Sequence, residues 1–434
     1  MVLQQWSRFP FTLVKSLACI ILCLFLVNCS ANQDVNRIEL TLWQGVNPPP
    51  NRQVLQQLVD RFNQEHPQIH VNSLYVGQPD QQLPKILAAV VGNSPPDLLW
   101  YNPTVTGQLV NLGALRSLDD WWATTPRRTE ITPSLAETMT YDDHIWSVPF
   151  AANNLGIFYR PSLFEAAGVT QLPNTWPDLQ ATAQALTTTE HQRTNRHGIL
   201  LALGQGDFAV FTWLPFLWTA GGNLGATAAT AHLDTPAAIA AMEFWQNLIS
   251  TGVAIRSLPE RGYELDNFIN SRVAMQITGP WTLAQLNQSG IDFGVMPIPQ
   301  DPAQGDRAAA TALGGENLFI FKSTPEKETA ALLFADYVLS ETFQTDWALG
   351  TGYLPANIHS LENPRYQAFL TENPVIQVFL DQMPTARSRP LFPGYARFSE
   401  NLGRALESVL MEQNTPLEAL KIAEKHWQLM RPRQ

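Results

Sequence analysis

Cysteine is nearly absent from this chain of 434 residues, and its three copies, Cys19, Cys23 and Cys29, all lie within the first 30 residues. The rest of the chain therefore contains no disulfide and offers no cysteine as a zinc ligand or thiol nucleophile. Charged residues are also scarce, at 15% of the chain, and the formal net charge is -11. Because no run of Lys or Arg follows the N-terminal segment, the composition argues against a nucleic-acid partner and against a basic membrane-binding surface.

Several catalytic and cofactor motifs are missing as well. The patterns HExxH, GxSxG and GxxxxGK[ST] do not occur. His66 and His70 are four residues apart, but Pro67 between them argues against one helical face that carries both side chains. The acidic pairs at 119–120 and 142–143 are neighbours in the chain, which favours solvated turns over the two opposed carboxylates of a glycoside hydrolase. We expect no metal and no cofactor.

One apolar run stands out near the N-terminus. Arg8 and Lys15 precede apolar residues 17–27, a pattern typical of an export signal and too short to span a membrane comfortably. The run ends in LVNCS, which resembles a bacterial lipobox in which Cys29 becomes the lipidated first residue of the mature protein. The alternative is cleavage after Ala31, which gives a soluble secreted form. We expect a signal peptide over 1–29, a tether over 30–36 and a location on the periplasmic side, with a lipid anchor in the membrane.

The folded part begins with alternating strand and helix patterns. Residues 37–45 read as a strand, and apolar residues at helical spacing predict a helix within 51–67. A strand over 69–76, a second helix and a strand at 97–100 follow, which is typical of a mostly parallel sheet. The length of the chain predicts two domains, yet no long Gly/Ser linker separates them. The chain should therefore cross between two lobes more than once, near 147–153, 295–300 and 350–355.

Five segments carry a family resemblance: GGENLFIF, TGYLPA, GPW, PPDLLW and VPFAANNLGIFYRPSLFEAAGV. From about residue 38 to the end, the chain resembles the family 1 extracellular solute-binding proteins of bacterial ABC importers, the group of maltose-, trehalose- and glycerol-3-phosphate-binding proteins. The resemblance implies an α/β fold of two lobes, each a mostly parallel sheet with flanking helices, joined by hinge crossings. We expect an N-lobe of 37–149 plus 299–352 and a C-lobe of 150–298 plus 353–434.

The resemblance also implies a function without catalysis. A monomer of this kind captures a sugar, glycoside or polyol in the cleft between its lobes. It then delivers the ligand to membrane permease subunits that are driven by a separate ATPase. Three alternatives stay open: a ligand of the glycerol-3-phosphate type, a secreted carbohydrate-active enzyme, and a sensory protein that reports ligand occupancy to a receptor.

Candidate ligand contacts follow from residues that match the family motifs. The amide of Asn153 supplies both a donor and an acceptor for a hydroxyl group, and Trp281 offers a flat face at a strand end. Glycines before Glu316 let backbone come close to a ligand. The full candidate set is Trp43, Gln44, Asn102, Asn153, Trp218, Gly222, Trp281, Gly315, Glu316, Tyr353 and Arg389.

Some of these assignments have a structural alternative. Trp43 is either a stacking face or a core residue. Glu316 is either a ligand contact or a satisfied carboxylate at a hinge. Arg389 is chosen over Arg387 and Arg397 as the arginine that reaches the ligand from the second lobe.

Overall fold

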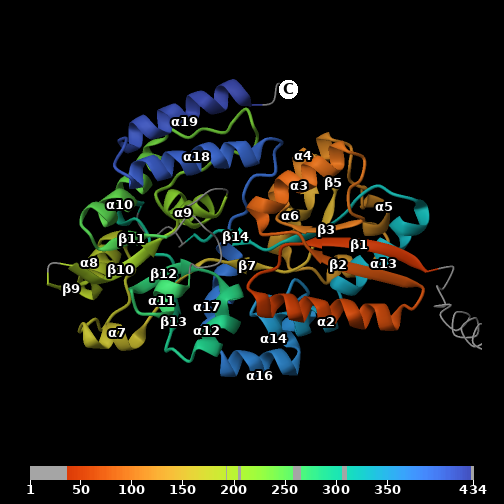
Figure 1. Cartoon of the computed structure of the whole chain (residues 1–434), viewed down its shortest axis with the longest axis horizontal. Helices are drawn as coiled ribbons and strands as arrows, with labels where there is room; N and C mark the ends of the chain where they lie inside the picture. The colour runs from red at the N-terminus through yellow and green to blue at the C-terminus, as the bar shows by residue number, and fades with distance from the viewer. Residues whose placement is uncertain (1–36, 192, 204–206, 258–264, 305–309, 432–434) are drawn as a thin grey trace, which may run out of the picture.

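The computed structural model describes residues 37–191, 193–203, 207–257, 265–304 and 310–431, which form two sheets with helices around each (Figure 1). The first sheet has the strand order β2-β1-β3-β15-β6, and β15 is antiparallel to both of its neighbours while β1, β2 and β3 are parallel. Its strands are β1 (Ile38–Gln44), β2 (Ile69–Tyr75), β3 (Leu98–Tyr101), β6 (Ser147–Pro149) and β15 (Asn317–Ile320).

Helices α2 (Pro49–Glu65), α3 (Pro79–Val91), α13 (Pro325–Val338) and α14 (Glu341–Thr351) flank this sheet. The predicted apolar stripe of α2 is buried, and it includes Leu55, Leu58, Val59 and Phe62. The Phe62 ring meets Phe334 of α13 edge-on at 5.0 Å, so one aromatic contact ties the first helix of the lobe to a helix that lies far along the chain.

The second sheet has the strand order β11-β10-β12-β8-β13, with β9 added at β10. Strand β8 runs against β12 and β13, whereas β10, β11 and β12 are parallel. The strands are β8 (Gly156–Tyr159), β9 (Thr188–Glu190), β10 (Arg193–Leu201), β11 (Ala254–Arg256), β12 (Val273–Thr278) and β13 (Gly294–Met296). Both sheets are thus mostly parallel, and the expected α/β class is confirmed.

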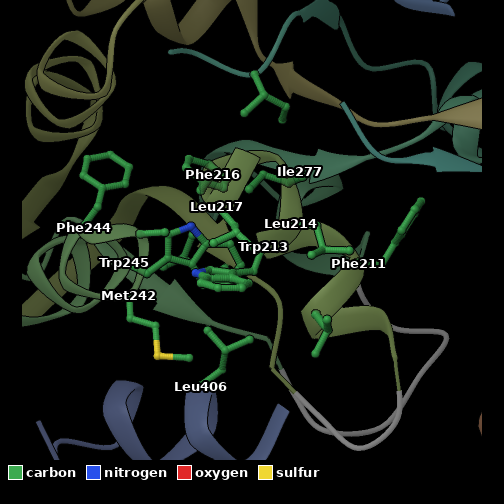
Figure 2. Close-up of a cluster of buried hydrophobic side chains, with 14 of the residues drawn as sticks. Phe211, Trp213, Leu214, Phe216, Leu217, Met242, Phe244, Trp245, Ile277 and Leu406 are labelled. Carbon is green, nitrogen blue, oxygen red and sulfur yellow. The ribbon is translucent and has the colours of Figure 1, made fainter. Parts of the chain in front are cut away.

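Aromatic packing forms the core beside the second sheet. Helices α8 (Trp176–Leu186), α9 (Phe208–Thr219), α10 (Pro236–Ser250), α18 (Tyr395–Leu410) and α19 (Pro416–Met430) surround it. Figure 2 shows Trp213, Phe216 and Trp245 gathered in this core, whereas Phe211 stands apart from them at the start of α9. A Cβ on Gly314, in the segment that crosses between the lobes, would stand 2.9 Å from Phe211, so Phe211 lies near the junction of the two lobes.

Short strands connect the two sheets. The chain leaves the first sheet after β6, passes through β7 (Asn153–Asn154) and enters the second at β8. It returns after β13 through β14 (Leu313–Gly314), which pairs with β7, and reaches β15. Two isolated bridges, Ala152 to Leu354 and Ala312 to Arg387, add further backbone pairing at this point.

Shorter elements complete the fold. The expected boundary at residue 353 assigns helices α15 (Ile358–Glu362) and α16 (Pro364–Glu372) to the C-lobe. Both helices contact α14, which lies beside the first sheet. Within the described ranges no helix is both long enough and apolar enough to cross a membrane. The remaining elements are α4 (Thr106–Asn111), α5 (Asp119–Trp122), α6 (Ala136–Met139), α7 (Pro161–Ala166), α11 (Asp266–Ile269), α12 (Leu283–Ser289), α15 (Ile358–Glu362), α16 (Pro364–Glu372), α17 (Val375–Gln382), β4 (Thr140–Tyr141) and β5 (His144–Ile145), with short 3-10 turns between them.

Candidate functional site

A cavity of about 140 Å³ lies where the two sheets and the crossing strands meet. Engineered protein cavities of about 150 Å³ hold a benzene molecule, so this one has room for a six-membered ring. Its lining draws on both lobes: Asn47, Trp100 and Asn102 from the first, Phe211, Gln276, Thr278 and Trp281 from the second, and Asn153, Gly314, Gly315, Glu316, Tyr353 and Arg389 from the crossings and the C-terminal third. A ligand in this cavity contacts both lobes at once.

Two glycines set the shape of the crossing. Gly314 lies opposite Asn153 in the β7–β14 pair, and a Cβ there would stand 2.1 Å from the Asn153 Oδ1 atom and 2.9 Å from Phe211. Gly315 has φ of +109°, and its Cβ would stand 2.2 Å from the carbonyl oxygen of Ala151. The two crossing segments therefore approach so closely that neither position has space for a side chain.

Five buried polar atoms that belong to cavity-lining residues have no hydrogen-bond partner within the described part of the chain. They are Trp100 Nε1, Asn153 Oδ1, Gln276 Oε1, Glu316 Oε2 and Arg389 Nε. Leaving such an atom unpaired costs about 1–3 kcal/mol, so native proteins rarely do so without a reason. Two of the atoms are donors. The other three belong to groups that accept, and a hydroxyl group complements both kinds. Polar groups of both kinds are therefore buried in the residues that form the cavity wall.

Glu316 has an unusual protonation state for a carboxyl group. Burial raises its pKa from 4.5 to about 7, although the Arg389 guanidinium and the Tyr353 hydroxyl act in the opposite direction. Burial also raises the pKa of Tyr353 well above its usual value, and the nearby Glu316 adds to that rise. Near neutral pH this side of the cavity therefore holds a neutral phenol beside a carboxyl group that is only partly ionised.

Arg389 is the arginine that reaches the cavity. Its guanidinium lies 4.4 Å from the centre of the Phe211 ring, and its Nη1 atom donates to Asp207 Oδ2. Arg387 instead lies 5.9 Å from the Trp218 ring, and its backbone pairs with the 311–313 segment. Arg397 does not line the cavity.

Asn102 and Trp281 both line the cavity. The Asn102 Oδ1 atom accepts hydrogen bonds from the Thr104 backbone N–H and hydroxyl, which caps the short turn after β3. The Trp281 indole lies over the backbone of Gly279, where a Cβ would stand 1.9 Å from the ring. Trp281 is only partly buried, so part of its ring faces the cavity.

The structure brings seven of the candidate contacts together in this cavity: Asn102, Asn153, Trp281, Gly315, Glu316, Tyr353 and Arg389. It does not bring four others there, namely Trp43, Gln44, Trp218 and Gly222. Trp43 packs against a small cluster beside β3, and Gln44 Oε1 accepts from the Val46 backbone N–H at 2.9 Å. Trp218 is buried in the core of the second lobe, and a Cβ on Gly222 would stand 2.4 Å from Leu217.

Several cavity residues were not predicted from the sequence. Gln276 and Thr278 lie on β12 directly before the GPW motif, and Trp100 ends the predicted strand before Asn102. These three adjoin predicted residues, so strand ends next to a motif were a usable signal. Asp207 and Phe211 open a helix whose apolar sequence indicates only core. Within the described residues, no cluster of His, Cys, Asp or Glu is arranged to hold a metal ion.

The family model for bacterial extracellular solute-binding proteins matches residues 57–372, which is more than half of the chain. The chain belongs to this family. The resemblance read from the sequence motifs is therefore confirmed.

Known relatives of the chain are distant but cover most of it. It is 22% identical to the maltotriose-binding protein of Pyrococcus abyssi over 88% of this chain and 80% of that one. It is 24% identical to the sn-glycerol-3-phosphate-binding periplasmic protein UgpB of Escherichia coli over 86% and 88%. Its fold matches the structure of UgpB from Mycobacterium tuberculosis in complex with glycerophosphocholine, with a TM-score of 0.80, 24% identity and coverage of 90% and 98%.

Proposed function

We propose that this protein is the substrate-binding subunit of an ABC importer and that it captures an uncharged sugar, glycoside or polyol in the cavity between its lobes. The lining of one cavity by polar and aromatic side chains from both lobes carries this proposal. The amides of Asn102, Asn153 and Gln276 suit the hydroxyl groups of a polyhydroxylated ring, and the aromatic ring of Trp281 suits its apolar face.

The position of the site supports a capture mechanism. The cavity is lined from both lobes, and the connections between the lobes are short strands. A ligand that contacts both lobes favours the closed arrangement over any open one, and closure then removes the ligand from water. Membrane permease subunits and a separate ATPase are the partners that this role requires.

Export and anchoring belong to the same proposal. The signal segment, the tether and Cys29 lie outside the described residues. Lipidation at Cys29 would hold the binding lobes on the periplasmic side of a membrane through the short tether, and the folded part then acts as a monomer.

The proposal is tested by titrating the purified protein with a panel of neutral and phosphorylated compounds. The panel contains maltose, maltotriose, glycerol, myo-inositol, glycerophosphocholine and sn-glycerol-3-phosphate. We expect saturable one-to-one binding of a neutral compound in isothermal titration, and a thermal midpoint that rises with ligand concentration by mass action. No binding across the neutral compounds would contradict the proposal.

The rival function is glycoside hydrolysis, which needs two carboxyl groups on opposite sides of the bond that breaks. Three acidic residues line the cavity and are the candidates for that pair: Asp80, Asp207 and Glu316. Asp207, however, accepts hydrogen bonds from Arg389, Tyr395 and Ser399. Prolonged incubation with a bound sugar, followed by chromatography, decides between the two: an importer subunit returns its ligand unchanged, whereas an enzyme releases products.

A further inference from the structure

Asp207 is a carboxylate in the cavity wall that accepts three hydrogen bonds. Its Oδ2 atom accepts from Arg389 Nη1, and its Oδ1 atom accepts from the Tyr395 hydroxyl at 3.1 Å and from the Ser399 hydroxyl. Arg389 is itself 8% exposed, and the Phe211 ring covers one face of its guanidinium at 4.4 Å. The orientation of Arg389 is therefore determined by Asp207 and Phe211 together.

The same contact sets the charge of the cavity. Arg389 is the one cationic side chain among the described residues that line it, and the acidic residues that line it are Asp80, Asp207 and Glu316. The ion pair between Arg389 and Asp207 cancels the positive charge that a phosphate group would need. Phosphate recognition in proteins uses guanidinium or ammonium groups, often as a bidentate fork, and a carboxylate paired with such a group competes with the phosphate.

We propose that Asp207 is a positioning and specificity-determining residue, which holds Arg389 for hydrogen bonding to hydroxyl groups and neutralises it so that the cavity rejects phosphate monoesters. The inference rests on the proposed function and adds the ligand charge that this chain selects. Arg389, which lines the cavity, then meets a hydroxyl oxygen as a guanidinium whose charge Asp207 balances.

The test compares Asp207→Asn with the wild-type protein and with a matched control. Asparagine keeps the size of the side chain and removes its charge, so Arg389 regains a net positive charge in a buried wall. The control is Asp292→Asn, because Asp292 also accepts from a buried arginine, Arg160, at 2.8 and 2.9 Å, but does not line the cavity. The probes are sn-glycerol-3-phosphate, inorganic phosphate and the neutral compound that the wild-type protein binds most tightly, each measured by isothermal titration at two salt concentrations.

We expect Asp207→Asn to bind sn-glycerol-3-phosphate at least tenfold more tightly than the wild-type protein, with an affinity that falls as salt rises. The neutral compound should bind about tenfold more weakly, because Arg389 loses its fixed orientation. The double variant Asp207→Asn/Arg389→Gln should lose the gain in phosphate affinity. Asp292→Asn should change the free energy of unfolding and leave the affinities for the phosphate and neutral compounds unchanged. Asp207→Glu keeps the charge and should still reject phosphate, which separates charge from a purely structural effect.

An unchanged ratio of phosphate to neutral affinity in Asp207→Asn would overturn the inference. A wild-type protein that prefers sn-glycerol-3-phosphate to every neutral compound would overturn it as well. If the wild-type protein binds no compound at all, the proposed function fails, and the gain of inorganic phosphate binding in Asp207→Asn still tests the charge balance separately. Circular dichroism shows whether Asp207→Asn folds. If it does not, phosphate binding is compared between Asp207→Glu and Arg389→Gln instead. Phosphate binding that appears in Asp207→Glu contradicts the inference.

Discussion

The clearest energetic consequence of the site is a pH-dependent stability that one side chain causes. Burial raises the pKa of Glu316 from 4.5 to about 7 in the folded protein. The folded state therefore binds a proton more tightly than the unfolded chain does. The stabilisation associated with the protonated carboxyl group is fully present below about pH 4.5 and is lost as the pH rises through about 7.

The size of the effect follows from the two pKa values. Each pKa unit corresponds to about 1.4 kcal/mol, so a rise from 4.5 to about 7 gives at most about 3 kcal/mol. Partial solvent access to Glu316 reduces this figure. We expect the free energy of unfolding of the wild-type protein, relative to Glu316→Gln, to fall by about 1–3 kcal/mol between pH 4.5 and pH 8.

The assay is urea denaturation of both proteins without ligand at half-unit steps of pH. Other titrating groups contribute equally to both proteins, so the difference between the two free energies isolates Glu316. The difference should decline with rising pH and level off above about pH 8. A difference that stays constant, or that increases with pH, would refute the argument that Glu316 is buried and short of compensating partners.

Three other predictions concern packing, stacking and anchoring. Gly314→Ala forces its Cβ against Asn153 and Phe211, so ligand affinity should fall at least tenfold. Gly222→Ala should lower the thermal midpoint and leave ligand affinity unchanged. Equal ligand affinities in the two variants would contradict the assignment of the cavity as the binding site. Trp281→Ala should weaken binding about tenfold and lower the free energy of unfolding less than Trp245→Ala does, because Trp281 is only partly buried. Trp245→Ala should lower the free energy of unfolding by about 3–5 kcal/mol in urea titrations and leave ligand affinity unchanged, and the reverse ordering would contradict this assignment. Cys29→Ser should release the protein from the membrane fraction of expressing cells and abolish the incorporation of labelled fatty acid, and continued labelling would rule out Cys29 as the lipidation site.

Local patterns in the sequence were sufficient to predict the alternation of strands and helices in the first sheet, and the family resemblance supplied much of the cavity. The helix α2 and strands β1 to β3 follow from apolar spacing and proline positions, because these elements depend on their own residues. Glu316 and Arg389 were predicted because they match positions of the family motifs, and both line the cavity.

The rest depended on contacts that no local pattern encodes. Trp218 and Trp281 are both aromatic residues near glycines, and only the packing of α9 into the second core shows that Trp218 is buried there. Asp207 and Arg389 are 182 residues apart in the chain, so their ion pair could not be inferred from spacing. The charge of the cavity was for the same reason not predictable from the sequence alone.

The measurement that tests the central claim most directly is isothermal titration of the purified protein with the panel of neutral and phosphorylated compounds, followed by chromatography of the recovered ligand. The account predicts one-to-one binding of an uncharged sugar, glycoside or polyol that is recovered intact, and weaker binding of sn-glycerol-3-phosphate. Preferred binding of the phosphate ester, consumption of the bound compound, or no binding by any neutral compound would contradict it.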